Sequence, residues 1–337
     1  MRFVTARRVT SHDLRDWLDS HTVWQMRGVF HLRSKEAFKA RLPGTLTCLI
    51  LLSAIGWGAS AEDLAGQQRS QPLRGARCTY AAPPRTADGR VDVERLVAEL
   101  VELHANTYRW VSRPDETNRQ DFRKFLPLAR AHQIRAWVTV NPPSERQPKD
   151  IRPLEQRLAE YEQWGVDFAR LSLVETNFVA WSIDDFVWNL KFFTPEATRK
   201  IVTAARQVNP RFAFLPCCYY KAATARFAKD YGPVCDGVMF PYRDESGGAN
   251  FTNSTHVAAE VKAMREKFGP ACPIIVGVFG SRHSKLGVSA PEYVERVMRA
   301  AHPCADGISI YRHPNKTTDP EKHEIVKRLY TEWSAAK

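Results

Sequence analysis

Short apolar runs alternate with longer amphipathic stretches along the chain from Arg77 onward. The short runs are typical of buried strands. In the longer stretches apolar residues recur every three or four positions, as they do over residues 93–101, which is typical of helices. Regular alternation of the two predicts a parallel sheet built from βα units. The predicted strands are Arg77–Ala81, Thr107–Ser112, Arg135–Asn141, Phe178–Asp184, Arg211–Tyr219, Gly237–Tyr242, Pro273–Phe279 and Gly307–Tyr311.

Eight strands, each followed by a helix, fit one particular α/β architecture. Several helices begin with a capping residue just before proline, as in Thr194-Pro195 and Asp319-Pro320. Eight such units over about 260 residues match the size of a (β/α)8 TIM barrel. A doubly wound open sheet is the alternative, but Ala81-Ala82-Pro83-Pro84 replaces the glycine-rich phosphate loop that a dinucleotide fold requires there. The sequence therefore predicts a single TIM barrel over residues 76–337.

The first 61 residues have the pattern of a secretory leader. Arg41 precedes an apolar run from Leu46 to Gly58, and Ala59-Ser60-Ala61 follows with small residues at the positions that a signal peptidase reads. The run is short for a membrane span, although an uncleaved N-terminal anchor stays an alternative. Met26 is a second candidate start, because signal peptides seldom begin so far upstream of their apolar core. We expect a secreted or periplasmic protein, with residues 62–75 as a flexible lead-in to the barrel and no membrane contact after cleavage.

Net charge adds little to this picture. The 337 residues contain 49 Lys and Arg against 37 Asp and Glu, a net charge of +12. Residues 1–61 hold 9 of the basic and 4 of the acidic residues, which leaves 40 against 33, or +7. The basic residues are scattered among acidic ones without interleaved aromatics, so nucleic-acid binding is not expected. The residual charge is compatible with an acidic glycan or an envelope surface. Nothing in the sequence sets an oligomeric state.

Six cysteines remain once Cys48 is removed with the leader. An even number in an exported protein permits disulfides. In a closed barrel Cys235 and Cys272 start neighbouring strands, as do Cys78 and Cys304, so bridges 235–272 and 78–304 are geometrically possible. Buried free thiols are the alternative. No cysteine or histidine spacing is typical of zinc, and we expect neither a metal nor another cofactor.

Barrel enzymes carry their chemistry at the carboxyl ends of the strands, so we expect the side chains at these ends to lie together. Aromatic rings, amides, arginines and acids gather there. Aromatic faces with directional polar partners suit sugar rings, which makes a carbohydrate the expected substrate or ligand. The alternative is that the aromatic residues only pack the rim. The predicted binding residues are Trp110, Asn141, Tyr219, Tyr220, Tyr242, Arg243, Glu245, Tyr311 and His313.

Two adjacent carboxylates, Asp184 and Asp185, end the fourth predicted strand. Strand alternation places Asp184 on the inward face, whereas Asp185 enters the barrel mouth only if the chain turns there. Neighbouring carboxylates raise each other's cost of ionising, which suits acid catalysis near neutral pH. The alternative is that the pair caps the following helix, because Asp is a favoured N-cap residue.

The stretch Phe178-Val179-Ala180-Trp181-Ser182-Ile183-Asp184-Asp185-Phe186 resembles retaining β-N-acetylhexosaminidases of the O-GlcNAc-hydrolase and hyaluronidase type. Those enzymes are barrels with an Asp-Asp pair after strand four. The resemblance implies substrate-assisted hydrolysis, in which Asp184 would hold the 2-acetamido group as internal nucleophile and Asp185 would protonate the leaving oxygen. Adjacent residues do not readily straddle a glycosidic bond, so the alternative to substrate assistance is a third carboxylate such as Asp244 or Glu245.

Two other functions stay open. Metal-dependent polysaccharide deacetylases also use an Asp-Asp pair, in a Phe-Asp-Asp-Gly signature with two histidines four residues apart. Here Phe186 follows the pair, and no two of the ten histidines have that spacing. The other possibility is a barrel that binds glycan without cleaving it, since fold does not fix function. The orientation of Asp185 distinguishes a hydrolase from a glycan-binding barrel. In a hydrolase it faces the cleft, whereas in a binding barrel it folds back over the next helix.

Overall fold

The computed structural model describes residues 61–146 and 150–335. Apart from Ala61, the predicted leader lies outside the described residues. Among the helices that are described, none is long and apolar enough to span a lipid bilayer.

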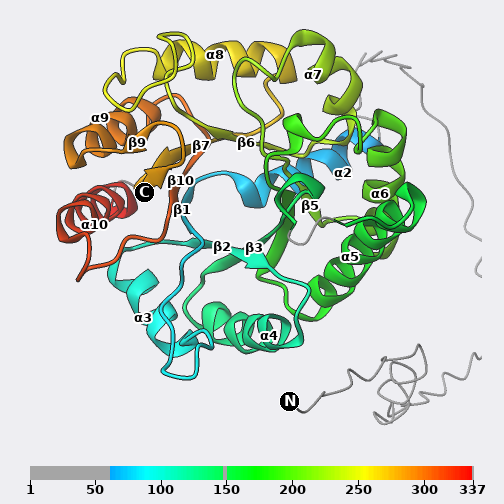
Figure 1. The fold of residues 1–337 in the computed structure, drawn as a ribbon, viewed down its shortest axis with the longest axis horizontal. Helices are drawn as coiled ribbons and strands as arrows, with labels where there is room; N and C mark the ends of the chain where they lie inside the picture. The colour runs from blue at the N-terminus through cyan, green and yellow to red at the C-terminus, as the bar shows by residue number, and fades with distance from the viewer. Residues whose placement is uncertain (1–60, 147–149, 336–337) are drawn as a thin grey trace, which may run out of the picture. The chain divides into compact units, whose positions relative to one another are not determined.

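Eight parallel strands form the sheet at the centre of the molecule (Figure 1). Neighbours in the sheet follow the order β5-β4-β3-β2-β1-β10-β7-β6. A parallel bridge between Cys217, just after β5, and Met239 on β6 joins the two ends and closes the barrel. The strands are β1 (Ala76–Tyr80), β2 (Thr107–Ser112), β3 (Arg135–Val140), β4 (Phe178–Ile183), β5 (Ala213–Phe214), β6 (Val238–Pro241), β7 (Ile274–Phe279) and β10 (Gly307–Tyr311).

Helices surround the strands, as Figure 1 shows. The α-helices are α2 (Ala61–Ser70), α3 (Val93–Glu102), α4 (Glu116–Ala131), α5 (Leu154–Val174), α6 (Pro195–Val208), α7 (Ala225–Tyr231), α8 (Val257–Phe268), α9 (Pro291–Ala301) and α10 (Pro320–Ala335). Short 3-10 helices are η1 (Gln71–Leu73), η2 (Pro143–Glu145), η3 (Phe186–Trp188) and η4 (Gly232–Val234), and a small hairpin joins β8 (Arg282–His283) to β9 (Gly287–Val288). This arrangement is the predicted TIM barrel, with ends of most strands within a residue or two of their predicted positions.

The fifth strand is shorter than predicted. The sequence predicted Arg211–Tyr219, but only Ala213–Phe214 forms regular strand. Pro216 has no N–H to donate, so it interrupts the ladder. Hydrogen bonds to β4 nevertheless continue on either side of it, from Leu215 N to Trp181 O at 3.0 Å and from Cys217 N to Ile183 O at 3.1 Å. The chain therefore keeps the predicted direction and still delivers residues 217–219 to the rim.

Strand alternation separates two hydrophobic cores. Trp181 and other outward residues pack between the sheet and the helices. Ala180, on the opposite face of β4, belongs to a smaller core inside the barrel. Asp184 has the same parity as Ala180 and so begins at the inner face. The inner core comprises Leu73, Ala76, Cys78, Trp137, Ala180, Ala213, Leu215, Met239 and Ile275.

Residues 62–75 are not the flexible lead-in that the sequence suggested. They form α2 and η1, which place Leu73 in the inner core at the amino-terminal end of the strands. Arg69 is buried and donates from Nε to Asp236 Oδ1 at 2.6 Å. Burial of Arg69 and Leu73 therefore holds residues 62–75 in place, although their polar composition alone predicts no regular structure.

All six cysteines of the described chain are free thiols. The bridges 235–272 and 78–304, which strand adjacency permitted, are therefore absent, and the alternative of free thiols is correct, although not all six are buried. Cys78, Cys217, Cys218 and Cys272 are buried, whereas Cys235 and Cys304 are partly exposed.

Candidate functional site

Two adjoining cavities open at the carboxyl ends of the strands. The larger lobe, of about 570 Å³, is lined by residues on or just after all eight strands of the barrel, and its wall contains Asp184, Asp185, Tyr219 and Arg109. The smaller lobe, of about 320 Å³, lies beside the loops after β1 and β2. Both lobes share five lining residues: Tyr80, Glu145, Asp184, Tyr311 and Arg312. The cleft thus has a carboxylate-bearing junction with space on either side.

Asp184 lies at this junction. The inward parity of β4 carries its side chain into the mouth, and the hydroxyl of Tyr80, at the end of β1, donates to Oδ2 at 2.6 Å. The backbone N–H of Asp185 donates to Oδ1 at 3.2 Å. Burial, followed by the charge of Asp184, raises the pKa of Tyr80 well above its usual value, so this hydroxyl stays a donor at neutral pH. Asp184 is therefore an oriented hydrogen-bond acceptor.

Asp185 also faces the cleft. Its backbone is left-handed, with φ 42° and ψ 34°, so the chain turns at this residue. Within the described chain its side chain makes no capping hydrogen bond to η3, and it instead hydrogen-bonds with Tyr219 and Glu145. Burial and then the charge of Asp184 raise its pKa. The geometry thus excludes the reading of Asp185 as a side-chain helix cap.

A third carboxyl group, Glu145, completes the cluster and was missed by sequence reasoning. It ends η2, the turn that follows β3, and lines both lobes. The residue as a whole is exposed, but its carboxyl group hydrogen-bonds with Asp185 in the wall of the cleft. Burial, then the charges of Asp184 and Asp185, raises the pKa of Glu145 to about 8. The Glu145–Asp185 pair therefore holds a proton at neutral pH.

Arg109 forms part of the wall behind this cluster and was also missed. It is 4% exposed, and its guanidinium carbon lies 4.2 Å from the centre of the Tyr80 ring. One Nη2 hydrogen bond reaches Thr139 Oγ1 at 3.2 Å, whereas Nε has no partner among the described residues. The stacked guanidinium supports the ring whose hydroxyl orients Asp184.

Tyr219 is a predicted binding residue that the structure places beside Asp185. It lines the larger lobe, and Arg243 covers its ring at 4.3 Å. Arg243 is in turn held by Glu245, with its Nε 2.7 Å from Oε1. The exposed Trp188, another residue that sequence reasoning missed, lies 5.9 Å from Tyr219 between ring centres. Arg243 and Glu245 thus support the rim and do not line either lobe.

Three other predicted binding residues border the lobes, but one of them belongs mainly to the core. Tyr311 lines both lobes, and Asn141 lines the smaller one. Trp110 also borders the smaller lobe, but it is 2% exposed and packs mainly on Phe122 of α4. It belongs to the outer core because it has the parity of Tyr108.

Besides Arg243 and Glu245, three predicted residues lie outside the cleft, which corrects the sequence interpretation. Tyr242 is fully buried and donates to Asn253 O at 3.2 Å, because it shares the outward parity of Phe240. Tyr220 packs against Phe240 and Lys267. His313 hydrogen-bonds with Thr79 at 2.9 Å and with Glu99 on α3 at 3.1 Å. β10 ends at Tyr311, so strand alternation no longer governs His313.

Neither proposed third carboxylate reaches the cleft. Asp244 is fully buried and hydrogen-bonds with His256 and Asn250, both at 2.6 Å. Glu245 accepts from the backbone N–H of Lys221 at 2.6 Å as well as from Arg243. Glu145 supplies the third carboxyl group instead.

One set of groups in the cleft has the separation of a metal site. Single ligand atoms of Asp184, Asp185 and Cys217 all lie within 4.8 Å of one another. Burial and then the two aspartate charges raise the pKa of Cys217 well above its usual value, so the thiol is protonated. A neutral thiol is a weak ligand, and this set contains no histidine. The donor set therefore fits the zinc chemistry of a deacetylase poorly.

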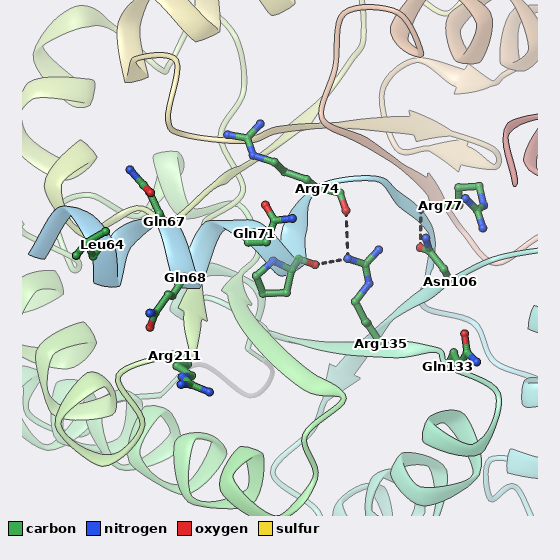
Figure 2. A pocket seen from close by; sticks show the side chains of 11 residues that line it. Leu64, Gln67, Gln68, Gln71, Arg74, Arg77, Asn106, Gln133, Arg135 and Arg211 are labelled. Atoms are coloured by element: carbon green, nitrogen blue, oxygen red, sulfur yellow. Dashed lines mark hydrogen bonds between the residues drawn. The ribbon is translucent and has the colours of Figure 1, made fainter. Parts of the chain in front are cut away.

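A still larger cavity, of about 1010 Å³, lies at the opposite end of the barrel, between α2 and the starts of several strands (Figure 2). Its wall contains four arginines and no carboxylate. Backbone carbonyls already engage two of them, since Arg135 donates to Arg74 O at 3.1 Å and Arg77 donates to His104 O at 2.9 Å. Arg74 itself forms an ion pair with Asp306. These contacts account for Arg74, Arg77 and Arg135 as structural supports near the starts of the strands.

The sequence matches no protein-family model and no curated protein. Solved structures share the fold. They include a GH2 β-galacturonidase from Eisenbergiella tayi bound to galacturonate, with a TM-score of 0.53 and 13% identity over 77% of this chain and 52% of that chain. An endo-1,4-β-mannanase from Eisenia fetida gives a TM-score of 0.52 and 9% identity over 76% of this chain and 91% of that one.

The catalytic domain of an endoglucanase from Thermobifida fusca is similar as well, with a TM-score of 0.52 and 12% identity over 75% of this chain and 91% of the other. The chain spans about half the length of the first structures that it matches, which are 50–52% covered. At such identities the likeness establishes the barrel fold, and the site must be argued from its own residues.

Proposed function

We propose that this protein is a glycoside hydrolase. The observation that carries the proposal is the cluster of Asp184, Asp185 and Glu145 at the junction of the two lobes, with a proton held between the last two. Barrel enzymes place their reacting groups at this end of the strands, and a glycosidic bond needs an acid that stays protonated near neutral pH. The known glycoside hydrolases with the same fold are compatible with this function.

The arrangement supports substrate assistance on an N-acetylated sugar. The carbonyl oxygen of the 2-acetamido group attacks the anomeric carbon while the glycosidic bond breaks. Asp184, oriented by Tyr80, accepts the amide N–H and stabilises the charge that develops on that group. Asp185 gives its proton to the leaving oxygen, and water then opens the cyclic intermediate after deprotonation by the same carboxylate. Export of the protein, as expected from its leader, is part of this proposal.

The second member of the acid pair has a supporting role. Glu145 shares a proton with Asp185, so the acid form of the pair is held near neutral pH before each turnover, and the proton taken from water restores it afterwards. Tyr219 hydrogen-bonds with Asp185 and fixes the carboxyl group that must reach the leaving oxygen. These contacts explain why the site needs three carboxyl groups although only one transfers the proton to the sugar.

The test compares Asp185→Asn and Asp184→Asn on aryl and alkyl N-acetylhexosaminides. Asp185→Asn should lower kcat/KM about a hundredfold or more on a substrate with a poor leaving group, because the acid is lost. The loss should be much smaller on a nitrophenyl glycoside, whose leaving group needs little protonation. Asp184→Asn should lower both rates alike, since it acts on the internal nucleophile before either group leaves.

Matched controls keep the test independent of folding. Both variants should melt within a few degrees of the wild type, because removing a charge from this cluster removes no core contact. Equal rates for wild type and both variants on every glycoside, with unchanged glycan binding, would leave a binding protein without turnover. Activity on glycosides without an acetamido group, at rates equal to those with one, would overturn substrate assistance but not hydrolysis.

A further inference from the structure

Three arginines surround the smaller lobe from three neighbouring strands. Arg85 lies in the loop after β1, Arg113 follows β2, and Arg312 follows β10. β1 pairs directly with both β2 and β10. The carboxyl ends of adjacent strands lie at one edge of the sheet, so the loops that follow them border the same part of the rim. The sheet thus gathers three positive charges around one sugar-sized space.

None of these arginines forms an ion pair with a carboxylate of the described residues. Arg85 donates to the backbone oxygen of Gly89 at 2.6 Å, and Arg312 hydrogen-bonds with the hydroxyl of Tyr311. Elsewhere in the described chain most arginines pair with Asp or Glu, as Arg90 does with Asp121 at 2.6 Å. The guanidinium groups at the smaller lobe therefore keep donors available for a ligand.

The acidic groups of the cleft do not cancel this charge. Only Glu145 and Asp184 line the smaller lobe, both at its junction with the larger one. Glu145 shares a proton with Asp185 at neutral pH, because its pKa is raised to about 8. Asp184 keeps its negative charge at the junction, where it accepts the hydroxyl of Tyr80. Away from the junction, positive charge dominates the wall.

The rest of the wall suits a sugar ring. Asn141 borders the lobe, and Asn118 fixes the edge of Trp110 by accepting its indole N–H at 3.2 Å. Amide groups offer directional hydrogen bonds to hydroxyls, and aromatic edges exclude water from the ring's apolar face. A volume of about 320 Å³ lies at the lower end of small-ligand sites.

We propose that the smaller lobe is a subsite for an anionic sugar residue, next to the residue that is cleaved in the larger lobe. This inference rests on the proposed function and names its substrate class: a glycan that carries a carboxylate, sulfate or phosphate on the sugar adjoining the scissile bond. Arg113 and Arg312 hold the anionic group, and Arg85 adds long-range attraction. Arginine suits this role because its planar guanidinium binds oxyanions in a bidentate manner.

The test measures binding and turnover separately. The ligands are an oligosaccharide that alternates N-acetylhexosamine with hexuronate and the same oligosaccharide after reduction of its carboxyl groups to alcohols. Calorimetry with the Asp185→Asn protein should give a Kd at least tenfold lower for the acidic form, and added salt should reduce the difference. A sulfated N-acetylhexosamine oligosaccharide distinguishes sulfate from carboxylate as the preferred anion.

Variants locate the effect. Arg113→Gln and Arg312→Gln should each raise the Kd for the acidic oligosaccharide about threefold to tenfold and leave that for the reduced form unchanged. Arg199→Gln removes the same charge from the exposed face of α6 and should change neither Kd. Circular dichroism of each variant confirms that the barrel is intact.

Each outcome separates the two proposals. Preferential, arginine-dependent binding of the acidic form without any hydrolysis would sustain the subsite and overturn the glycoside hydrolase. Hydrolysis of N-acetylhexosaminides with equal Kd for acidic and reduced forms would sustain the hydrolase and overturn the subsite. A preference that Arg113→Gln and Arg312→Gln leave intact would overturn the assignment to the smaller lobe.

Discussion

The pair of Glu145 and Asp185 shows how neighbouring residues set the chemistry of a single group. Each carboxyl group lies close to Asp184, so ionising all three together is costly. The protonation state of lowest free energy keeps one proton between Glu145 and Asp185, because this relieves the repulsion. Burial is the larger cause of the raised pKa of both groups, and the charge of Asp184 adds to it, so the acid form depends on the enclosure of the cluster as well as on its arrangement.

Protonation of Glu145 should make the stability of the protein depend on pH. Its pKa rises on folding from about 4.5 to about 8, so the folded state binds more protons than the unfolded state within that interval. The stabilisation is present below about pH 4.5 and is lost as the pH rises through about 8. The difference in melting temperature, wild type minus Glu145→Gln, should therefore decrease between pH 5 and pH 9.

The catalytic rate should depend on the same protonation of the Glu145–Asp185 pair. The rate on substrates with poor leaving groups should fall as the pH passes about 8, and Glu145→Gln should move this limb to lower pH because Asp185 loses its proton partner. Glu324→Gln, which removes an exposed acid on α10, should change neither profile. A melting-temperature difference that stays constant from pH 5 to pH 9 would contradict the raised pKa.

Strand alternation predicted some site residues and would have predicted more. It placed Asp184 on the inner face of β4, and the same parity applied to β1 and β2 identifies Tyr80 and Arg109. The same rule excludes Tyr242 from the cleft, because Tyr242 lies two residues after Phe240, which faces outward. Glu145 could not be found this way, because it lies in a 3-10 turn after β3 where no period applies.

At the scale of elements, α2 is the feature that local sequence could not reveal. Its polar, glutamine-rich sequence carries no strong apolar stripe, and its place in the fold depends on contacts with residues far along the chain. Asp236, before β6, accepts hydrogen bonds from Arg69, from Arg206 at 3.0 Å and from the backbone of Phe214 at 2.9 Å. Such long-range pairing is invisible to periodicity, whereas the βα units are defined locally.

Arg69→Ala should destabilise the barrel strongly. The side chains of Arg69 and Asp236 are 5% and 3% exposed, so the substitution leaves a buried carboxylate short of a charged partner. Breaking one side of a buried ion pair costs about 3–5 kcal/mol, which corresponds to a fall in melting temperature of about 10 °C for a domain of this size. Thermal denaturation followed by circular dichroism measures it.

Arg170→Ala is the matched control for that prediction. Arg170 forms an ion pair with Asp167 at 3.3 Å on α5, but both side chains are more than half exposed. An exposed pair contributes at most about 1 kcal/mol, so the melting temperature should barely move. Equal effects of the two substitutions would show that α2 does not contribute to the stability of the barrel.

At the scale of the whole molecule, alternation of apolar runs with amphipathic stretches sufficed to predict the barrel, because each βα unit is specified by its own residues. The site is different in kind. It combines Tyr80, Glu145, Asp185 and Arg312, which lie at or just after the ends of β1, β3, β4 and β10 and are far apart in sequence. The order of these strands in the curved sheet is therefore what converts separate local predictions into one cleft.

The thiols provide a test of the closed barrel as a whole. Four of the six cysteines in the described chain are buried, and burial raises the pKa of all six, so the thiolate that reacts is scarce in the folded state. Protein beginning at residue 61, purified without reductant, should react slowly with a thiol reagent while native. After denaturation, six thiols per chain should react with the reagent, with or without prior reduction. Fewer than six without reduction would show a disulfide, and rapid native reaction of the buried cysteines would show that the barrel is open.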